Sequence, residues 1–283
     1  MRFVHPEGPV QPGSLEAVLY TDARGRVVMP RGNTYMPVHF HATPAQTPAR
    51  RYRGWLEAAE PLADAMKARG AVGTVLLAPD VADVRPWVWR GFRAGLGYTL
   101  VLGFPFEDAV VDHSVRKKLK QAARAGYVCE RTTRFADVAR CLNASEGRQG
   151  FSYNLSAADL ERARELLGDE HLRAYVCYSA SGEPASARVV LHREGACAVD
   201  WVAGTADAHL PAGATQAVIA ETLADVQRAG AAGFDFAGAN HRTVAAAKMN
   251  WGATLLPCFT LEQYTARNVA KWGVFWYRAL RSR

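Results

Sequence analysis

Hydrophobic residues recur along this chain with two spacings. Runs in which every second residue is apolar are typical of strands, and longer stretches with an apolar residue every third or fourth position are typical of amphipathic helices. The first spacing and short apolar runs predict strands at 17–20, 26–29, 72–78, 98–102, 127–131, 172–178, 185–192, 196–204, 234–236 and 255–261. The second spacing predicts helices at 51–70, 83–92, 113–126, 135–145, 156–167, 214–228, around Lys248 and from about Thr265.

Turn and cap signals divide these elements. Asp22-Ala-Arg-Gly25 is expected to close a hairpin, and Ser181-Gly182-Glu183 another. The proline-bearing stretch 42–50 reads as a loop, and Gly70 as a helix stop. Ser156, with Asp159 three residues later, predicts a capped helix start. The element order is β-β-α-β-α-β for the first hundred residues and α-β-α-α-β-β-β-α-β-α-β for the rest, which indicates an α/β (α+β) fold.

Composition narrows the class of protein. The chain has 283 residues, 49% of them hydrophobic and 22% charged, as in ordinary globular proteins. No apolar run approaches the roughly 20 residues of a membrane helix, and the N-terminus has no apolar signal-peptide core. We therefore expect a cytoplasmic protein without stable membrane insertion. The five cysteines show no CxxC or zinc spacing and are expected to be reduced core thiols. His39 and His41 share a strand face but have no evident third ligand, so no metal site is expected.

The net charge of +7 favours a polyanionic partner, such as a nucleic acid, a nucleotide-bearing substrate or an anionic membrane. Basic residues concentrate at Arg116, Lys117, Lys118 and Lys120, and again in the last twenty residues. The first group could bind tRNA or nucleotide phosphates, and a solvated helix face is the alternative. The C-terminal segment, rich in tryptophan, could touch a membrane surface or pack against the rest of the chain.

The stretch 233–252 carries the strongest candidate chemistry. It reads as a buried strand, a glycine break, a polar turn and an alanine-rich helix that contains Lys248. A fixed cation beside a strand end could stabilise the oxyanion that develops when an amine attacks an ester or thioester. An exposed helix lysine or an ion-pair partner is the alternative for Lys248. Asp235 could orient Lys248 or the attacking amine, or it could cap the next turn.

Several segments resemble the Fem-type aminoacyl and peptidyl transferases of the GNAT acyltransferase superfamily. The stretch with Asp235 and Lys248 resembles that family's "DF-G" strand and the "FK…(F/W)G" helix after it, although Ala247 stands where the family has Phe. Residues 83–99 resemble the end of its first unit, 115–126 its basic helix, and 200–211 its central strand and the loop that follows. These segments span about residues 80–262.

The resemblance implies two GNAT-like units, each a twisted mixed sheet flanked by helices, with a cleft between them. We expect an N-terminal unit at 1–110, a catalytic unit at 111–264 that begins with the basic helix, and a C-terminal helix at 265–283 that packs back on the first unit. In this family the lysine that matches Lys248 is assigned to oxyanion stabilisation. The expected reaction moves an aminoacyl group from aminoacyl-tRNA to an amine on a small metabolite or a peptidoglycan precursor.

Further residues are candidates for substrate contacts. Asn240 could position groups or simply cap the helix, and His241 and Arg242 lie in the same turn, where an anion could bind. Asp200 and Trp201 could line an acceptor pocket, or form a hydrogen-bonded core pair. The glycine-rich loop 145–153 contributes Arg148 and Tyr153 as possible acceptor contacts.

Two other functions stay open. An acyl-CoA-dependent GNAT N-acyltransferase would need a pyrophosphate loop before the helix at 214, and Ala208–Thr215 matches that motif only in Gly213. A non-catalytic RNA- or membrane-binding module is the third reading, which Ala247 and the few polar site residues keep open. No cofactor is expected apart from aminoacyl-tRNA as donor, or acyl-CoA for the second function.

Overall fold

The structure is a computed structural model that describes residues 1–30, 32–44, 47–150, 152–240, 242–265, 268–270 and 272–273. The chain forms two compact units: unit 1 comprises 1–97 and 257–283, and unit 2 comprises 98–256. These boundaries lie within the strands β7 (Phe92–Gly103) and β13 (Thr254–Gln263). The boundaries expected from the sequence lie at 110/111 and 264/265. The two sets differ because a boundary inside a strand leaves no linker signal in the sequence.

A long helix organises unit 1. Helix α1 (Pro48–Arg69) begins where the Thr47 side chain accepts a hydrogen bond from the Arg50 amide, and it ends at Gly70. Its buried face consists of small and aliphatic residues, Ala58, Ala59, Leu62, Ala63 and Met66. This face packs in one core with the antiparallel sheet β1-β2-β4, made of β1 (Arg2–His5), β2 (Leu15–Val18) and β4 (Val38–Phe40). The N-terminal segment is thereby anchored.

The predicted hairpin at 17–29 is formed only in part. An isolated bridge joins Thr21 to Val27, but β2 pairs with β1 and β4. Strand β3 (Val27–Val28) pairs in parallel with β5 (Ala71–Val72). The apolar run 72–78 is likewise divided into β5 and β6 (Val75–Leu76), and β6 pairs with β13. Alternation predicts that a segment is a strand, but its partner is chosen by the tertiary arrangement.

The remaining elements of unit 1 are the short helix α2 (Arg85–Trp89) and the first part of β7. The buried Trp87 of α2 packs in the same core as α1, and its indole nitrogen donates to the sulfur of Met66 at 3.1 Å. The predicted helix at 83–92 is therefore present but shorter, since β7 already begins at Phe92.

Unit 2 is a mixed sheet with helices on both faces. Its strand order is β7-β12-β11-β10-β9-β8, and within it only β11 and β12 run parallel among the described pairings. The strands are β8 (Val128–Arg131), β9 (Leu172–Tyr178), β10 (Pro184–Leu191), β11 (Cys197–Thr205) and β12 (Gly233–Asp235). The helices are α3 (His113–Arg124), α4 (Phe135–Gln149), α5 (Ala157–Leu167), α6 (Ala214–Arg228) and α7 (Arg242–Met249), with short 3₁₀ turns at Asp108–Val110 and Asp207–His209.

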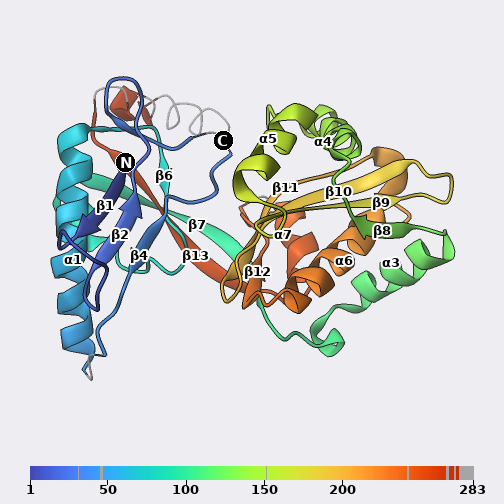
Figure 1. Cartoon of the computed structure of the whole chain (residues 1–283), viewed down its shortest axis with the longest axis horizontal. Coiled ribbons are helices and arrows are strands. Elements are labelled where there is room, and N and C mark those ends of the chain that lie inside the picture. Colours follow the sequence, from blue (N-terminus) through green and yellow to red (C-terminus); the bar gives the residue numbers. More distant parts are fainter. Residues whose placement is uncertain are drawn as a thin grey trace. The chain divides into compact units, whose positions relative to one another are not determined.

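Two separate cores cover the two faces of the unit 2 sheet. Helices α3 and α6 pack on one face, and α4 and α5 pack on the other (Figure 1). The approach of α4 to β11 requires Gly204, because a Cβ at this position would overlap the carbonyl of Cys141. Helix α5 starts with the capping box predicted from Ser156 and Asp159. In the described part of the chain, no helix has both the length and the apolarity needed to cross a bilayer.

Candidate functional site

The candidate site lies in unit 2, where strands β11 and β12 part. Their parallel pairing covers only Cys197–Val199 and Gly233–Asp235. Beyond it, β11 continues along β10, with an irregularity in register between Val189 and Val190 that leaves Trp201 as the additional residue. The chain after β12 instead follows β7: the Phe236 amide donates to the Leu100 carbonyl at 2.9 Å, and the Ala239 amide to the Tyr98 carbonyl at 2.7 Å. The polar groups that follow Val199 and Asp235 therefore lie where β11 and β12 separate from each other.

The turn after β12 is held by a buried carboxylate and a buried hydroxyl. Asp235 is 3% exposed, and its Oδ1 accepts hydrogen bonds from Thr99 Oγ1 at 2.5 Å and from the Ala237 amide at 2.8 Å. Thr99 Oγ1 in turn accepts from the Gly238 amide at 3.2 Å. Both side chains thus fix the backbone of the turn, which agrees with the interpretation of Asp235 as a carboxylate that caps the next turn.

The ammonium of Lys248 closes the same turn from the other side. Lys248 lies in the last turn of α7, and its Nζ donates to the carbonyls of Phe236 at 2.5 Å, Ala237 at 2.8 Å and Gly238 at 2.8 Å. Burial lowers its pKa from the ordinary lysine value, and the carboxylates of Asp200 and Asp235 oppose this shift. The result is a partly buried cation whose position is set by three main-chain oxygens at a strand end.

A buried ion pair lies within electrostatic range of this cation. Arg188 on β10 and Asp200 on β11 form an ion pair, with side chains only 6% and 7% exposed. Arg188 Nε and Asp200 Oδ1 are buried without a hydrogen-bond partner in the described part of the chain. Burying a charge is costly unless it is paired. Arg188 and Asp200 must therefore stay together, which holds β10 and β11 in register beside the point where β11 and β12 part.

Arg148, near the end of α4, and Tyr153, in the segment after α4, contact the far part of β11. The Tyr153 hydroxyl donates to the Ala203 carbonyl at 3.2 Å, and burial raises the pKa of this hydroxyl. Arg148 Nη1 donates to the Thr205 carbonyl at 3.0 Å and forms an ion pair with Asp207. Both side chains therefore donate hydrogen bonds to β11 carbonyls beyond the segment that pairs with β12. These bonds attach the polar stretch 145–153 to β11.

The structure thus gathers some of the predicted residues and places others apart. Lys248 and Asp235 hold one turn, and Asn240 Oδ1 accepts from the Tyr98 amide at 3.0 Å beside it. Arg242 is exposed at the start of α7, and Trp201 packs half-buried against the α4–α5 core. His241 lies outside the described residues, as does most of the predicted helix 265–283.

Two members of the site had no role in the sequence-based prediction. The Thr99 hydroxyl donates a hydrogen bond to Asp235 and accepts one from the Gly238 amide. A threonine within an apolar strand gives no indication in the sequence that it has such a role. Arg188 had a signal, because it is a single charge within the otherwise uncharged strand Pro184–Leu191. A charge in a strand buried on both faces requires a partner, and this could have drawn attention to Asp200.

The basic face of α3 forms a second candidate surface. His113, Arg116, Lys117, Lys120, Gln121 and Arg124 line a shallow hollow of about 330 Å³. Lys118 points elsewhere: its Nζ bonds to the Pro211 carbonyl and lies 3.3 Å from Gln121 Oε1. The predicted phosphate-binding group is therefore divided, with Arg116, Lys117 and Lys120 on the open face and Lys118 attached to the loop before α6.

The loop before α6 also helps to distinguish aminoacyl-tRNA from acyl-CoA as the donor of the acyl group. Gly213, the one residue that matches the pyrophosphate motif, precedes α6, and a Cβ there would lie 2.5 Å from the Lys118 carbonyl oxygen. The backbone of α3 therefore lies directly against the start of α6. A carbonyl oxygen at this position presents partial negative charge where a pyrophosphate needs amide donors.

Metal ligands do not gather in the part of the chain that the structure describes, which contains no group of three His, Cys, Asp or Glu side chains suited to an ion. The two predicted strand histidines lie close, with ring centroids 4.4 Å apart, and His41 Nε2 lies 3.0 Å from Glu16 Oε2.

Comparison with solved structures shows the fold. The chain is similar to FemX, with a TM-score of 0.63 and 12% identity over 92% of this chain and 87% of that one. It is also similar to L-PGS from Bacillus licheniformis, with a TM-score of 0.58 and 12% identity over 90% and 83% of the two chains. A third match is the C-terminal domain of a putative lysylphosphatidylglycerol synthetase from Agrobacterium fabrum, with a TM-score of 0.58 and 11% identity over 89% and 82%.

The resemblance to Fem-type proteins seen in the sequence is thus confirmed at the level of the fold, over most of the chain. No protein-family model matches the sequence, and no curated protein matches it significantly. The low identities mean that this likeness lies in the arrangement of the elements rather than in shared residues.

Proposed function

We propose that this chain is an acyltransferase that moves an aminoacyl group from aminoacyl-tRNA to an amine, with formation of an amide. The acceptor is a small metabolite or a peptidoglycan precursor. The fold shared with FemX supports this proposal. The observation that carries it is the partly buried Lys248 ammonium beside the strand divergence, at the position that the Fem-type resemblance assigns to the oxyanion-stabilising lysine.

The reaction needs little from the protein beyond charge and position. The acceptor nitrogen attacks the ester carbonyl carbon of aminoacyl-tRNA and forms a C–N bond, so that the carbonyl oxygen becomes an oxyanion. The C–O bond to the ribose then breaks, and the proton lost by the amine passes to the departing ribose oxygen. A cation fixed close to the oxyanion lowers the barrier because it is already oriented when the charge develops.

In this proposal, the three carbonyls occupy the three N–H donors of Lys248, so that Nζ acts on the oxyanion through its positive charge. They hold Nζ at the strand end, so its charge needs no reorganisation during the reaction. Asp235 acts as a positioning residue, because with Thr99 it holds the turn that supplies these carbonyls. Asn240 joins the end of the same turn to β7, which also makes it a positioning residue.

In this proposal, the phosphates of the tRNA bind to the basic face of α3. Arg116, Lys117, Lys120 and Arg124 lie side by side on an open hollow, as phosphate contacts require. An acyl-CoA donor has less support, since the α3 backbone lies against Gly213 where the CoA pyrophosphate would need free amides.

A transfer assay tests the proposal. Purified protein is given a pool of charged tRNA and a set of small amines, with release of uncharged tRNA as readout, and acetyl-CoA replaces the tRNA in a parallel reaction. We expect turnover with charged tRNA only. Lys248→Ala should reduce turnover by about 10²-fold or more, because the fixed positive charge beside the oxyanion is lost. Lys67→Ala, an exposed lysine of unit 1, is the matched control.

Two outcomes would overturn the proposal. Turnover with acetyl-CoA alone would identify an acyl-CoA-dependent enzyme. Salt-sensitive tRNA binding without any transfer, equal in wild type and Lys248→Ala, would identify a non-catalytic RNA-binding module.

A further inference from the structure

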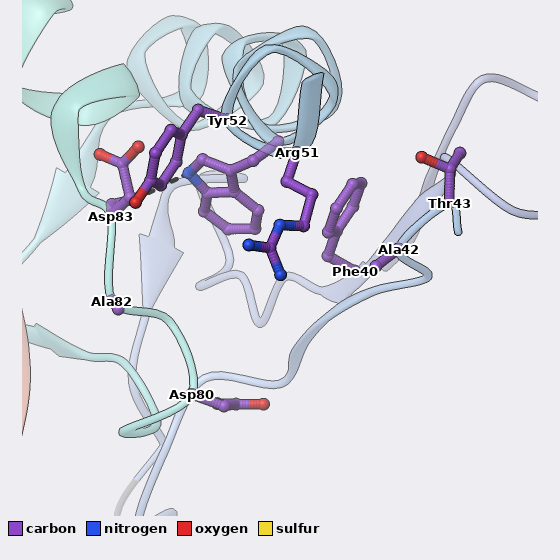
Figure 2. Close-up of a pocket in the computed structure, with 9 residues that line it drawn as sticks. Phe40, Ala42, Thr43, Arg51, Tyr52, Asp80, Ala82 and Asp83 are labelled. Atoms are coloured by element: carbon purple, nitrogen blue, oxygen red, sulfur yellow. Dashed lines mark hydrogen bonds between the residues drawn. The ribbon is translucent and has the colours of Figure 1, made fainter. Parts of the chain in front are cut away.

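A hollow in unit 1, separate from the residues assigned above, has the features of a small-molecule site. It measures about 250 Å³ and lies between the end of β4, the start of α1 and the loop 80–83 (Figure 2). Its wall is aromatic: Phe40 and Trp55 meet edge to face with ring centroids 5.6 Å apart, and the exposed Tyr52 lies beside them. The Trp55 indole nitrogen donates to the Asp83 carbonyl at 2.9 Å, which fixes the ring.

Two opposite charges face this hollow without neutralising each other. The Arg51 guanidinium is directed into it, and Asp80 lies on the loop across from it (Figure 2). No hydrogen bond or ion pair joins either side-chain charge to another residue in the described part of the chain. Asp83 differs, because Arg85 binds its carboxylate at 2.9 and 2.7 Å and lowers its pKa through these hydrogen bonds. Arg51 and Asp80 therefore remain available to a ligand.

We propose that the unit 1 hollow binds a free aromatic amino acid. Its carboxylate accepts two parallel hydrogen bonds from Arg51, its ammonium donates to Asp80, and its ring packs against Phe40 and Trp55. Arginine is suited to the planar carboxylate, and aromatic pairs add about 0.5–1.5 kcal/mol beyond area burial. A volume of about 250 Å³ lies just below the range for drug-sized ligands, which suits one amino acid.

The pair of charges selects among ligand classes. A mononucleotide could stack its base on the same rings and place its phosphate on Arg51, but the phosphate would be repelled by Asp80. A quaternary amine would pair with Asp80 but meet the cation of Arg51. Of these three classes, a zwitterion with a ring is the one that satisfies both charges and the aromatic wall. This site is independent of the proposed transfer reaction.

Isothermal titration calorimetry of the full chain tests the proposal. The ligands are L-phenylalanine, phenylalaninamide, N-acetylphenylalanine, L-leucine and uridine monophosphate. We expect L-phenylalanine to bind. The amide lacks the carboxylate and the N-acetyl compound lacks the ammonium, so each should bind at least 10-fold more weakly. L-leucine should also bind more weakly, because it lacks the ring.

Variants identify the groups responsible. Arg51→Gln and Asp80→Asn should each weaken L-phenylalanine binding at least 10-fold. Both residues are exposed, so neither substitution should affect folding. Circular dichroism of the two variants checks that they are folded. Arg53→Gln, on the same helix but lining the adjoining hollow, should leave binding unchanged. Equal binding by Arg51→Gln, binding of uridine monophosphate in preference to L-phenylalanine, or no binding of L-phenylalanine at millimolar concentration would overturn the proposal.

Discussion

The side-chain nitrogen of Lys248 donates a hydrogen bond of 2.8 Å to the carbonyl oxygen of Ala237, a residue whose backbone has a φ of 50°. Left-handed backbone is unfavourable for any residue with a Cβ, by about 1–2 kcal/mol. Gly238 also has a positive φ, of 78°. This backbone path brings the carbonyls of three successive residues to one point, where the ammonium binds them. The lysine therefore stabilises the turn that sets its own position.

The first prediction concerns this turn. Ala237→Gly relieves the left-handed conformation and should raise the free energy of unfolding by about 0.5–1 kcal/mol, since glycine's greater chain entropy offsets part of the gain. Lys248→Met leaves three carbonyls without their donor and should lower it by about 2 kcal/mol. Urea unfolding of both variants checks this. A Lys248→Met variant as stable as wild type would show that the carbonyls do not depend on the ammonium.

The second prediction concerns the buried ion pair of Arg188 and Asp200. Asp200→Leu leaves an unpaired guanidinium that is 6% exposed, and should lower the free energy of unfolding by about 3–5 kcal/mol. The double variant Arg188→Met/Asp200→Leu removes both charges and should recover most of this loss. Guanidinium chloride unfolding of the full mutant cycle measures the coupling.

The matched control for that cycle is the exposed pair of Arg134 and Glu130, with side chains 58% and 48% exposed. Removal of Glu130 should cost less than about 1 kcal/mol, because water screens an exposed pair. Equal losses for the two pairs would contradict the argument from burial.

The third prediction concerns acid stability. Burial alone would raise the pKa of Asp225, but hydrogen bonds from the Tyr175 hydroxyl and from Arg173, each of 2.7 Å, outweigh it and hold the pKa below 3.8. A depressed folded-state pKa gives stability that is present above the unfolded value and is lost as the pH falls through the folded value. The wild type should therefore lose this contribution below about pH 4.

Asp225→Asn has no carboxylate to titrate at this position. It should be less stable than wild type at pH 6, and the difference should shrink as the pH falls below about 4. Unfolding free energies of both proteins at several pH values from 6 to about 2.5 test this. A difference that stays constant with pH would show that the shift of the Asp225 pKa does not contribute to stability.

The fourth prediction concerns nucleic-acid binding by α3. Lys117→Gln and Lys120→Gln together should reduce the slope of log affinity for tRNA against log salt by about 2, because each substitution leaves one phosphate without its cation. Lys118→Gln is the control, because its ammonium is bound to the Pro211 carbonyl and lies off the basic face. Filter binding at four salt concentrations measures the slopes, and equal slopes for the two variants would locate the tRNA elsewhere.

Local signals in the sequence were sufficient for most helices. Thr47 and Gly70 delimit α1 close to the predicted loop and stop, and Ser156 with Asp159 starts α5 as expected. These features depend on residues a few positions apart, whose side chains satisfy the free ends of the same helix. They can be recognised without knowledge of the fold.

Partners far apart in the chain could not be recognised in this way. The strand predicted at 17–20 was expected to pair with 26–29, but this hairpin is formed only around the Thr21–Val27 bridge, and residues 17–18 instead belong to β2, which pairs with β1 and β4. Thr99 and Asp235 are 136 residues apart, and nothing in either strand indicates that they share a hydrogen bond. Arg148 and Tyr153 were proposed as substrate contacts, and that role stays a prediction while the structure shows them bonded to β11.

From the residues alone, the periodicity of apolar positions decided which segments are helices and strands, and the order of motifs indicated a Fem-type arrangement that the fold confirms. Lys248 and Asp235 could be singled out because they are isolated charges beside a buried strand. Their actual partners were decided by the tertiary structure: the carbonyls around Nζ converge only once α7 packs beside the end of β12. The physical reason is that apolar periodicity reports local burial, whereas a buried charge is satisfied by whichever polar group the complete fold brings within reach.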